Sequence, residues 1–166
     1  MSGATTDATE AGMYIEWNER FATGVEIVDK QHRGLIDILN GLFKSIGEGR
    51  SEAALLGVFG ELRRYADNHF DTEERLLKKH GVESRHQVEH VIRHVAYRRR
   101  IEALRARHDE GERLIPIQVL AFVSDWWLKH ILNCDRIFET LADGAEGGKA
   151  AGATENDPWP RSSPSA

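Results

Sequence analysis

Residues 55–77 read LLGVFGELRRYADNHFDTEERLL, and the spacing of the apolar side chains in this stretch decides the fold. They recur at intervals of three and four residues, which is the period of one face of an α-helix. That face carries Leu55, Val58, Phe59, Leu62, Tyr65, Leu76 and Leu77. It also carries His69 and Glu73, which lie together because they are four residues apart. We predict one long helix that begins after Ser51, a suitable N-cap, and ends near Gly81.

Three more segments with the same period accompany this helix. One runs from about Asp29 to Gly47, and another runs from about Glu83 to His108, with Gly111 ending it. The last begins near Pro116, a residue that suits the first turn of a helix, and its apolar positions continue to Leu141. The breaks are short and contain glycine, and no stretch alternates as a strand would. We therefore predict an all-α fold, an up-down-up-down antiparallel four-helix bundle.

The two ends of the chain differ from its middle in composition. The first residues are small and polar, and the last are rich in Gly, Ala, Ser and Pro, so both are predicted to be disordered. Between them, Tyr14 to Val28 is predicted to form an N-terminal extended arm that Trp17 and Phe21 anchor to the bundle. The predicted division is a disordered N-terminus, a four-helix domain and a flexible C-terminal tail, at residues 1–12, 13–142 and 143–166.

Composition excludes several classes of function. The 166-residue chain has a formal net charge of -5, which argues against a general nucleic-acid role. No apolar stretch approaches the roughly 20 residues that span a bilayer, so no membrane association is expected. Cys134 is the single cysteine, which fits a reducing compartment, and the start of the chain lacks the pattern of a signal peptide. We expect a cytoplasmic protein, and the composition points to no particular protein partner.

Metal-capable side chains occur on the apolar face of every predicted helix. The first helix offers His32, the second His69 with Glu73, and the fourth His130. The third carries one stripe of three histidines, His86, His90 and His94. Burying so many polar groups is costly unless each finds a partner, and a metal ion is one partner for all of them. Imidazole with carboxylate suits iron, and bundles build such sites between facing helices.

Four motifs resemble those of the hemerythrin domain, and they occur in that family's order across about residues 14 to 140. They are Trp17-Asn18 followed by GVEIVDKQH at 24–32, HFDTEE at 69–74, a His-x-x-x-His pair on the third helix, and DWWLKHI at 125–131 with Asp135 after it. One departure is the loop after Gly81, which lacks the aromatic–proline pair often found there in the family.

This resemblance implies two non-heme iron ions joined by an oxo or hydroxo bridge. It assigns His90, His94 and His130 to one iron, His32 and His69 to the other, and Glu73 and Asp135 to both as bridging ligands. The first iron is then six-coordinate, whereas the second keeps one open position. Dioxygen would bind there reversibly, which implies an oxygen carrier, store or delivery protein and not an enzyme.

An apolar pocket must keep water and protons away from such a site. The candidates to line it are Leu35, Ile36, Leu39, Trp126 and Trp127, although ordinary core packing explains these residues equally well. Tyr65 lies one turn before His69. It could lie beside the metals, or it could be a core tyrosine with its hydroxyl at the rim.

The third helix offers two possible ligand pairs, and the phase of its apolar stripe favours one of them. If His94 points inward, the residues that follow on its face suit a core; they are Tyr97, Ile101 and Leu104. The rival choice of His86 with His90 would bury two arginines, Arg93 and Arg100. We therefore predict His90 and His94.

The fourth helix needs a local distortion if both of its candidate ligands serve one site. His130 and Asp135 are five residues apart, which places them roughly 140° apart around an ideal helix. A π-type turn or an unwound segment near Asn133 would bring them together, and such features are common at functional sites.

Three other classes of function compete with oxygen binding. A sensor would normally carry an attached signalling domain. A di-iron peroxidase, oxidase or nitric oxide-handling enzyme is disfavoured by the histidine-rich ligand set, because ferritin-like di-iron enzymes use mostly carboxylates. A structural bundle without metal would bury several unpaired histidines at high cost.

Overall fold

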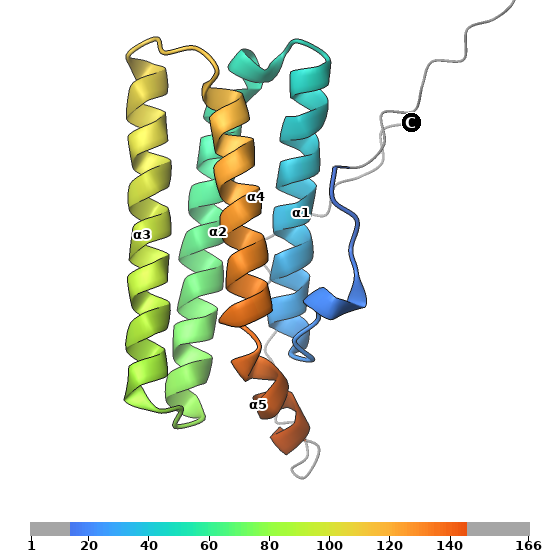
Figure 1. Cartoon of the computed structure of the whole chain (residues 1–166), viewed down its shortest axis with the longest axis vertical. Helices are drawn as coiled ribbons and strands as arrows, with labels where there is room; N and C mark the ends of the chain where they lie inside the picture. Colours follow the sequence, from blue (N-terminus) through green and yellow to red (C-terminus); the bar gives the residue numbers. More distant parts are fainter. Residues whose placement is uncertain (1–13, 146–166) are drawn as a thin grey trace, which may run out of the picture.

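The computed structural model describes residues 14–145 and is helical throughout its regular structure, with no strand in that range (Figure 1). In chain order it contains the 3-10 helix η1 (Glu19–Phe21) and the α-helices α1 (Glu26–Gly47), α2 (Ser51–Lys79), α3 (Ser84–Asp109), α4 (Ile115–Asn133) and α5 (Ile137–Ala145). The four long helices alternate in direction, so the predicted up-down-up-down bundle is confirmed. None of the helices described is both long and apolar enough to cross a membrane.

The turns between the long helices are short and fixed by backbone hydrogen bonds. At the end of α2, Gly81 adopts a φ of 65°, which only glycine adopts at no steric cost. The chain then folds back, so that the Val82 N–H donates to the Leu77 carbonyl at 3.0 Å and the Gly81 N–H donates to the Lys78 carbonyl at 3.2 Å. This pair of bonds satisfies carbonyls that the end of a helix leaves free. It also sends α3 back antiparallel to α2.

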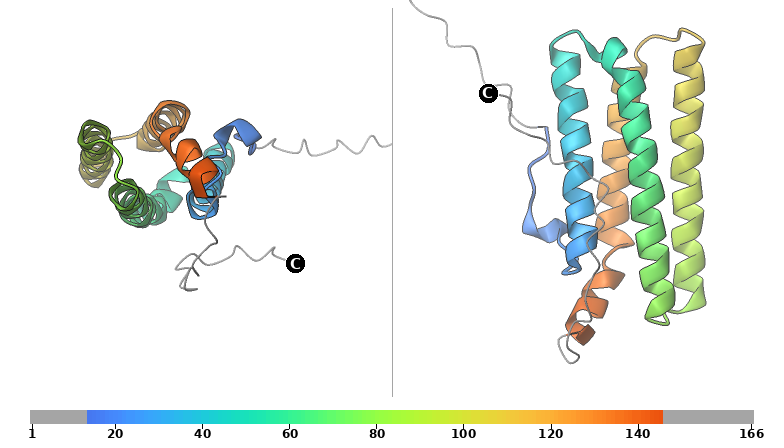
Figure 2. Two further views of the ribbon diagram at one scale, coloured as in Figure 1. Left: turned by 90° about the horizontal axis from the view of Figure 1, so that it is seen from below. Right: turned by 180° about the vertical axis from the view of Figure 1, so that it is seen from behind.

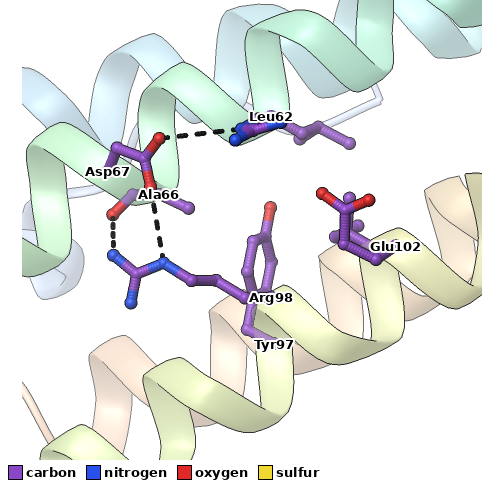
Figure 3. Close-up of a pocket in the computed structure, with 8 residues that line it drawn as sticks. Leu62, Ala66, Asp67, Tyr97, Arg98 and Glu102 are labelled. Atoms are coloured by element: carbon purple, nitrogen blue, oxygen red, sulfur yellow. Dashed lines mark hydrogen bonds and ion pairs between the residues drawn. The ribbon is translucent and has the colours of Figure 1, made fainter.

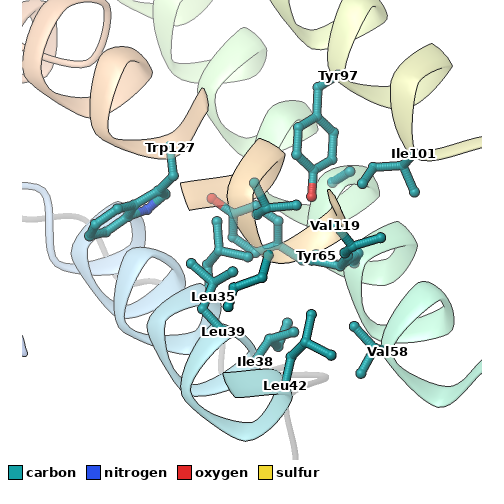
Figure 4. Close-up of a cluster of buried hydrophobic side chains, with 14 of the residues drawn as sticks. Leu35, Ile38, Leu39, Leu42, Val58, Tyr65, Tyr97, Ile101, Val119 and Trp127 are labelled. Carbon is teal, nitrogen blue, oxygen red and sulfur yellow. The ribbon is translucent and has the colours of Figure 1, made fainter. Parts of the chain in front are cut away.

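The long helices bury their apolar stripes against one another, in the cyclic order α1, α2, α3, α4 seen along the bundle axis (Figure 2). Figure 4 shows this core, in which side chains from all four helices interdigitate. The largest fully buried side chains are Trp127, Tyr97, Phe59, Phe70, Phe138, Leu35, Leu39, Leu42, Leu55, Leu62, Leu77 and Leu104. Because neighbours are antiparallel, the beginnings of α1 and α3 lie beside the ends of α2 and α4. Six of the seven candidate ligands lie in those four half-helices, and Asp135 follows the end of α4.

The N-terminal segment is only partly an extended arm, so the prediction of an arm from Tyr14 to Val28 is wrong in two places. Residues Glu19–Phe21 form η1, because the Asn18 side chain accepts a hydrogen bond from the Arg20 N–H at 3.0 Å. In addition, α1 begins at Glu26, three residues earlier than the predicted start.

Asp29 explains the early start of α1. Its carboxylate accepts hydrogen bonds from the Thr23 N–H at 2.6 Å, the Thr23 hydroxyl at 2.8 Å and the Gly24 N–H at 3.3 Å. These bonds hold the preceding loop against the first turn of the helix. The anchoring residues behave as predicted: Phe21 packs on Trp127 with ring centroids 4.9 Å apart, and Trp17 lies under the Arg33 guanidinium at 3.9 Å.

Replacing Gly24 by alanine should destabilise the protein by about 1–2 kcal/mol, because a side chain is strained in the left-handed region. Gly24 has a φ of 77°, and an added Cβ would lie 3.0 Å from the Cβ of Ala142. Urea unfolding measures the effect. The matched control is Gly41→Ala, inside α1, where an added Cβ meets nothing within 4 Å and should stabilise by about 0.5–1 kcal/mol. Equal effects of the two substitutions would contradict this account of the loop.

The fourth helix breaks where the five-residue spacing of its candidate ligands requires a distortion. α4 ends at Asn133, and α5 continues in a different direction (Figure 1). The Asp135 N–H donates to the His130 carbonyl at 3.2 Å, which is the hydrogen bond of a π-type turn. The expectation of apolar positions continuing to Leu141 on one helix is therefore corrected, because they belong to a separate helix.

The remaining predictions about the chain ends concern mostly residues beyond the described range. α5 continues through residue 145, so the predicted tail begins within a helix. The rest of that tail, from residue 146, lies outside the described residues. The predicted disordered N-terminus, residues 1–12, also lies outside them.

Candidate metal centre

The structure brings all seven predicted ligands together in the interior of the bundle. Their exposed fractions are at most 4% for the set His32, His69, Glu73, His90, His94, His130 and Asp135. Each lies on the inward stripe of its helix, except Asp135, which is in the turn between α4 and α5. The geometry agrees with the predicted set, and the binding of iron by these residues stays a prediction.

The seven side chains form two groups that share one carboxylate, that of Glu73. One group contains Glu73, His90, His94 and His130, and the other contains His32, His69, Glu73 and Asp135; the ligand atoms within each lie within 4.8 Å of one another. Each group therefore has the size of a coordination sphere around one ion. One has three imidazoles and the other has two.

Glu73 lies between the two groups. Its Oε1 is 3.3 Å from the Nε2 of His69, which belongs to the two-histidine group. Its Oε2 is 3.1 Å from the Nε2 of His94 and 3.6 Å from that of His130, which belong to the other. A carboxylate that points one oxygen at each group is placed to bridge two ions.

Asp135 occupies the corresponding position on the opposite side. Its Oδ2 is 3.3 Å from the Nε2 of His32. Its Oδ1 is 3.1 Å from the Nε2 of His90 and 3.2 Å from that of His130. The π-type turn at the end of α4 is therefore what makes a second bridging carboxylate possible.

The donor atoms fit a metal pair better than they fit one another. Buried side-chain atoms without a hydrogen-bond partner include both Glu73 oxygens, the Asp135 Oδ2, and the Nε2 atoms of His32 and His69. The Nε2 atoms of His94 and His130 face each other at 3.2 Å, although at most one of two neutral imidazoles can donate there. Buried polar atoms are seldom left unpaired, so this many indicate a missing common partner. Cations between these atoms would satisfy them.

Two ligand histidines are oriented by residues whose role the sequence did not indicate. The Nδ1–H of His69 donates to the Gln31 Oε1 at 3.0 Å, and the Gln31 amide in turn donates to the Thr72 hydroxyl at 3.1 Å. The Nδ1–H of His94 donates to the Glu74 Oε1 at 2.9 Å. These bonds leave each Nε2 lone pair directed at the centre, as is usual for metal-bound histidine.

His86 lies outside the centre. Half of its side chain is exposed, and its nearest ionic partner is the Glu83 carboxylate, at 3.7 Å. His94, by contrast, is fully buried and belongs to the three-histidine group. The phase of the apolar stripe on α3 predicted His94 as the inward-facing histidine, and His94 is the one that is buried in the bundle.

Aromatic rings stack on two of the candidate ligand histidines. Phe70 stacks on His94 with ring centroids 3.8 Å apart and an interplanar angle of 3°, and Trp126 stacks on His130 at 4.3 Å and 16°. The other predicted pocket residues are buried in the adjoining core; they are Leu35, Ile36, Leu39 and Trp127. Phe70 was not predicted, although it follows His69 directly in the sequence.

Tyr65 lies beside the centre, which decides between its two possible positions. Its ring stacks on His69 with centroids 4.9 Å apart, and only 3% of the residue is exposed. Burial, first, and the negative charge of Glu73 raise the pKa of its hydroxyl well above the usual value. The hydroxyl therefore stays protonated.

Burial keeps His69, His94 and His130 neutral, which metal binding requires. It lowers the pKa of His69 well below its ordinary value, that of His94 to about 2 and that of His130 to about 4. A neutral imidazole offers a lone pair to a metal, whereas a protonated one offers none.

The two carboxylates cannot both be ionised at low cost without a cation. Burial and the charge of Asp135 raise the pKa of Glu73 well above its usual value. Burial acts to raise the pKa of Asp135 too, but the charge of His130 and the close contacts with His32 and His90 outweigh burial and hold that pKa well below its usual value. Positive ions between the carboxylates would remove this conflict.

The metal-free protein should lose stability as the pH falls below about 6.5, the unfolded pKa of histidine. Folded His94 and His130 take up protons only near pH 2 and pH 4, so over this range the unfolded state binds more protons. The unfolding free energy should then fall by about 1.4 kcal/mol per pH unit for each histidine. Urea unfolding at several pH values measures this slope. His94→Gln should remove one histidine's share of this slope, and a slope equal to the parent's would contradict the burial of His94 in the centre.

A pocket of about 200 Å³ lies at the surface between α2 and α3, and none of the seven candidate ligands lines it (Figure 3). Its lining residues are Leu62, Arg63, Ala66, Asp67, Tyr97, Arg98, Ile101 and Glu102. Arg98 spans it, donating to the Ala66 carbonyl at 3.2 Å and facing the Asp67 carboxylate at 3.5 Å. It is separate from the metal centre.

The fold and the site together define a helical-bundle protein with a buried histidine–carboxylate cluster that could hold metal ions. A family model described as the hemerythrin HHE cation binding domain matches residues 23–142, and the chain belongs to the hemerythrin family. It is 28% identical to a protein named bacteriohemerythrin from Pseudomonas paraeruginosa, over 81% of this chain and 92% of that protein. Bacteriohemerythrins of Clostridium acetobutylicum and Methylococcus capsulatus are also 28% identical, over 72% and 71% of this chain and 95% and 88% of theirs.

Proposed function

We propose that this chain holds two non-heme iron ions, joined by an oxo or hydroxo bridge, and binds dioxygen reversibly at one of them. The observation that carries the proposal is the unequal division of histidines between the two groups. One group has three imidazoles and the other has two, and Glu73 belongs to both. Asp135, which belongs to the two-histidine group, also has an oxygen 3.1 Å from the Nε2 of His90 and 3.2 Å from that of His130. With the bridge added, the first ion would have six ligands and the second five. Only the second would have a position left for an exogenous ligand.

The side chains would divide the work as follows. His90, His94 and His130 would hold the saturated ion, and His32 and His69 the other. The two carboxylates would fix the separation of the ions, so that two electrons are available together when dioxygen binds. Phe70, Trp126 and the apolar core would exclude water, whose entry promotes irreversible oxidation of the metals.

The positions of the buried histidines and carboxylates favour reversible binding over an enzymatic reaction. Within residues 14–145, the buried histidines and Glu73 and Asp135 all have atoms directed at the two groups, so none is left as a general acid or base. Histidine-rich coordination also differs from the carboxylate-rich sites of ferritin-like di-iron enzymes. The bacteriohemerythrin name of the relatives supports the same conclusion. A cytoplasmic location stays a prediction from the sequence.

The proposal is tested by optical spectra of one sample in three states. The protein purified in air should show near-ultraviolet and visible bands of bridged ferric iron. Dithionite should remove nearly all colour, and oxygen admitted after the excess reductant is removed should restore a spectrum that differs from the first. Appearance of the original oxidised spectrum alone, at every time after mixing, would contradict reversible binding and favour an oxidase.

A further inference from the structure

Two buried hydrogen-bond donors beside the metal centre have no acceptor. The hydroxyl of Tyr65 and the indole N–H of Trp127 both lack a partner, and these residues are only 3% and 0% exposed. A buried donor without an acceptor costs free energy, and each such group in a folded protein calls for an explanation. A ligand that arrives from outside would explain both.

Both donors belong to the two-histidine side of the centre. Tyr65 is stacked on His69, and the Trp127 ring packs edge-on to His32 with centroids 6.5 Å apart. In Figure 4 the indole nitrogen lies on the edge of Trp127 that faces Tyr65, and the Tyr65 hydroxyl is directed to the side of the core where Trp127 lies. Leu35 is drawn below these two side chains.

The three-histidine side differs. The ring stacked most closely on a histidine there is Phe70, which carries no donor. Trp126, stacked on His130, is half-buried, and its indole nitrogen is not among the buried atoms without a partner. Tyr97 also has a buried hydroxyl without a partner, and its ring packs against Phe70 and Trp126. Tyr65 and Trp127 are therefore the unpaired donors whose rings contact His69 and His32, the histidines that would hold the second ion.

We propose that Tyr65 and Trp127 donate hydrogen bonds to the ligand bound at the open position, and so favour ligands with negative or acceptor atoms: reduced dioxygen and small anions such as azide. The inference rests on the proposed function, because it needs the second iron. Charge would move onto dioxygen as the irons are oxidised, and a neutral hydroxyl and an indole N–H stabilise that charge without supplying a proton. Tyr65 and Trp127 are thus specificity-determining residues of the same site.

Azide titration of the oxidised protein, followed by its charge-transfer absorption, tests the inference. Tyr65→Phe should weaken azide binding about tenfold or more, because a hydrogen bond to a charged acceptor is lost. It should also speed azide release, with iron content and thermal stability unchanged. The control is Tyr97→Phe, which removes an equally buried, unpaired hydroxyl on α3, and it should change azide affinity less than twofold.

Trp127 is tested by replacing it with β-(3-benzothienyl)alanine, which keeps the shape of the indole and lacks the N–H. This variant should also bind azide about tenfold more weakly. If Tyr65→Phe and the benzothienyl variant both hold two irons and bind azide as the parent does, the inference is wrong while the proposed function stands. If the parent protein binds no iron pair, the proposed function fails and this inference fails with it.

Discussion

His94→Ala should lose most of its iron, whereas His86→Ala should retain two irons per chain. The two histidines are eight residues apart on α3, but the fold treats them differently. His94 is fully buried, its Nε2 is 3.1 Å from a Glu73 oxygen, and its Nδ1 is held by Glu74. His86 is half exposed, with only the Glu83 carboxylate near it.

The expected loss is large because His94 is a predicted ligand and not a supporting residue. Loss of a residue that only orients a ligand already costs about 10–100-fold in metal affinity, so loss of a ligand should cost more. Iron is counted after anaerobic reconstitution and desalting, with circular dichroism to show that the helices persist. Retention of both irons by His94→Ala together with their loss from His86→Ala would place the ligand pair one turn earlier on α3.

Glu73→Gln should abolish binding of both irons, the second large effect. One oxygen of Glu73 points at each group, so the substitution removes a shared negative charge and replaces one of the two oxygens by an amide nitrogen that has no lone pair to donate. Less than one iron per chain is expected after reconstitution. The metal-free variant should be at least as stable as the metal-free parent, because burial raises the pKa of Glu73 and the neutral amide avoids the cost of a buried charge.

Glu74→Gln is the matched control for this substitution. Glu74 is the next residue along α2, but its side chain is 38% exposed and it contacts the centre only through His94. Loss of the Glu74 carboxylate should lower the affinity for one of the two ions by about 10–100-fold. Two irons per chain are therefore still expected when iron is in excess. Equal iron loss from Glu73→Gln and Glu74→Gln would contradict the assignment of Glu73 as a ligand that bridges both ions.

Much of the fold and of the centre is predictable from the sequence, because both depend on position along a helix. Helical period places His32, His69, Glu73 and His130 on inward faces, and short breaks make neighbouring helices antiparallel. The same helical period favours His94 over His86 as the inward-facing residue of α3. Even the break after Asn133 follows from angular geometry, since His130 and Asp135 cannot share a site on an ideal helix.

Features that depend on contacts between helices could not be predicted from the sequence. Gln31 and His69 are on different helices, as are Glu74 and His94, and no spacing rule links residues across a bundle. The local turn at Glu19–Phe21 depends on one hydrogen bond that the Arg20 N–H donates to the Asn18 side chain, and helical periodicity does not predict it. The helical spacing of apolar residues continues without interruption through the turn after α4. Periodicity alone therefore did not indicate that α5 is a separate helix.

Reversible dioxygen binding at a di-iron centre can be measured as oxygen uptake and release on one reduced, iron-loaded sample. Oxygen is added in steps to the anaerobic protein, with dissolved oxygen and absorption recorded together, and the gas phase is then exchanged for argon. The account predicts one dioxygen bound for every two irons, and recovery of both the oxygen and the colourless reduced spectrum. Consumption of oxygen that argon does not return, with hydrogen peroxide or water as the product, would contradict it.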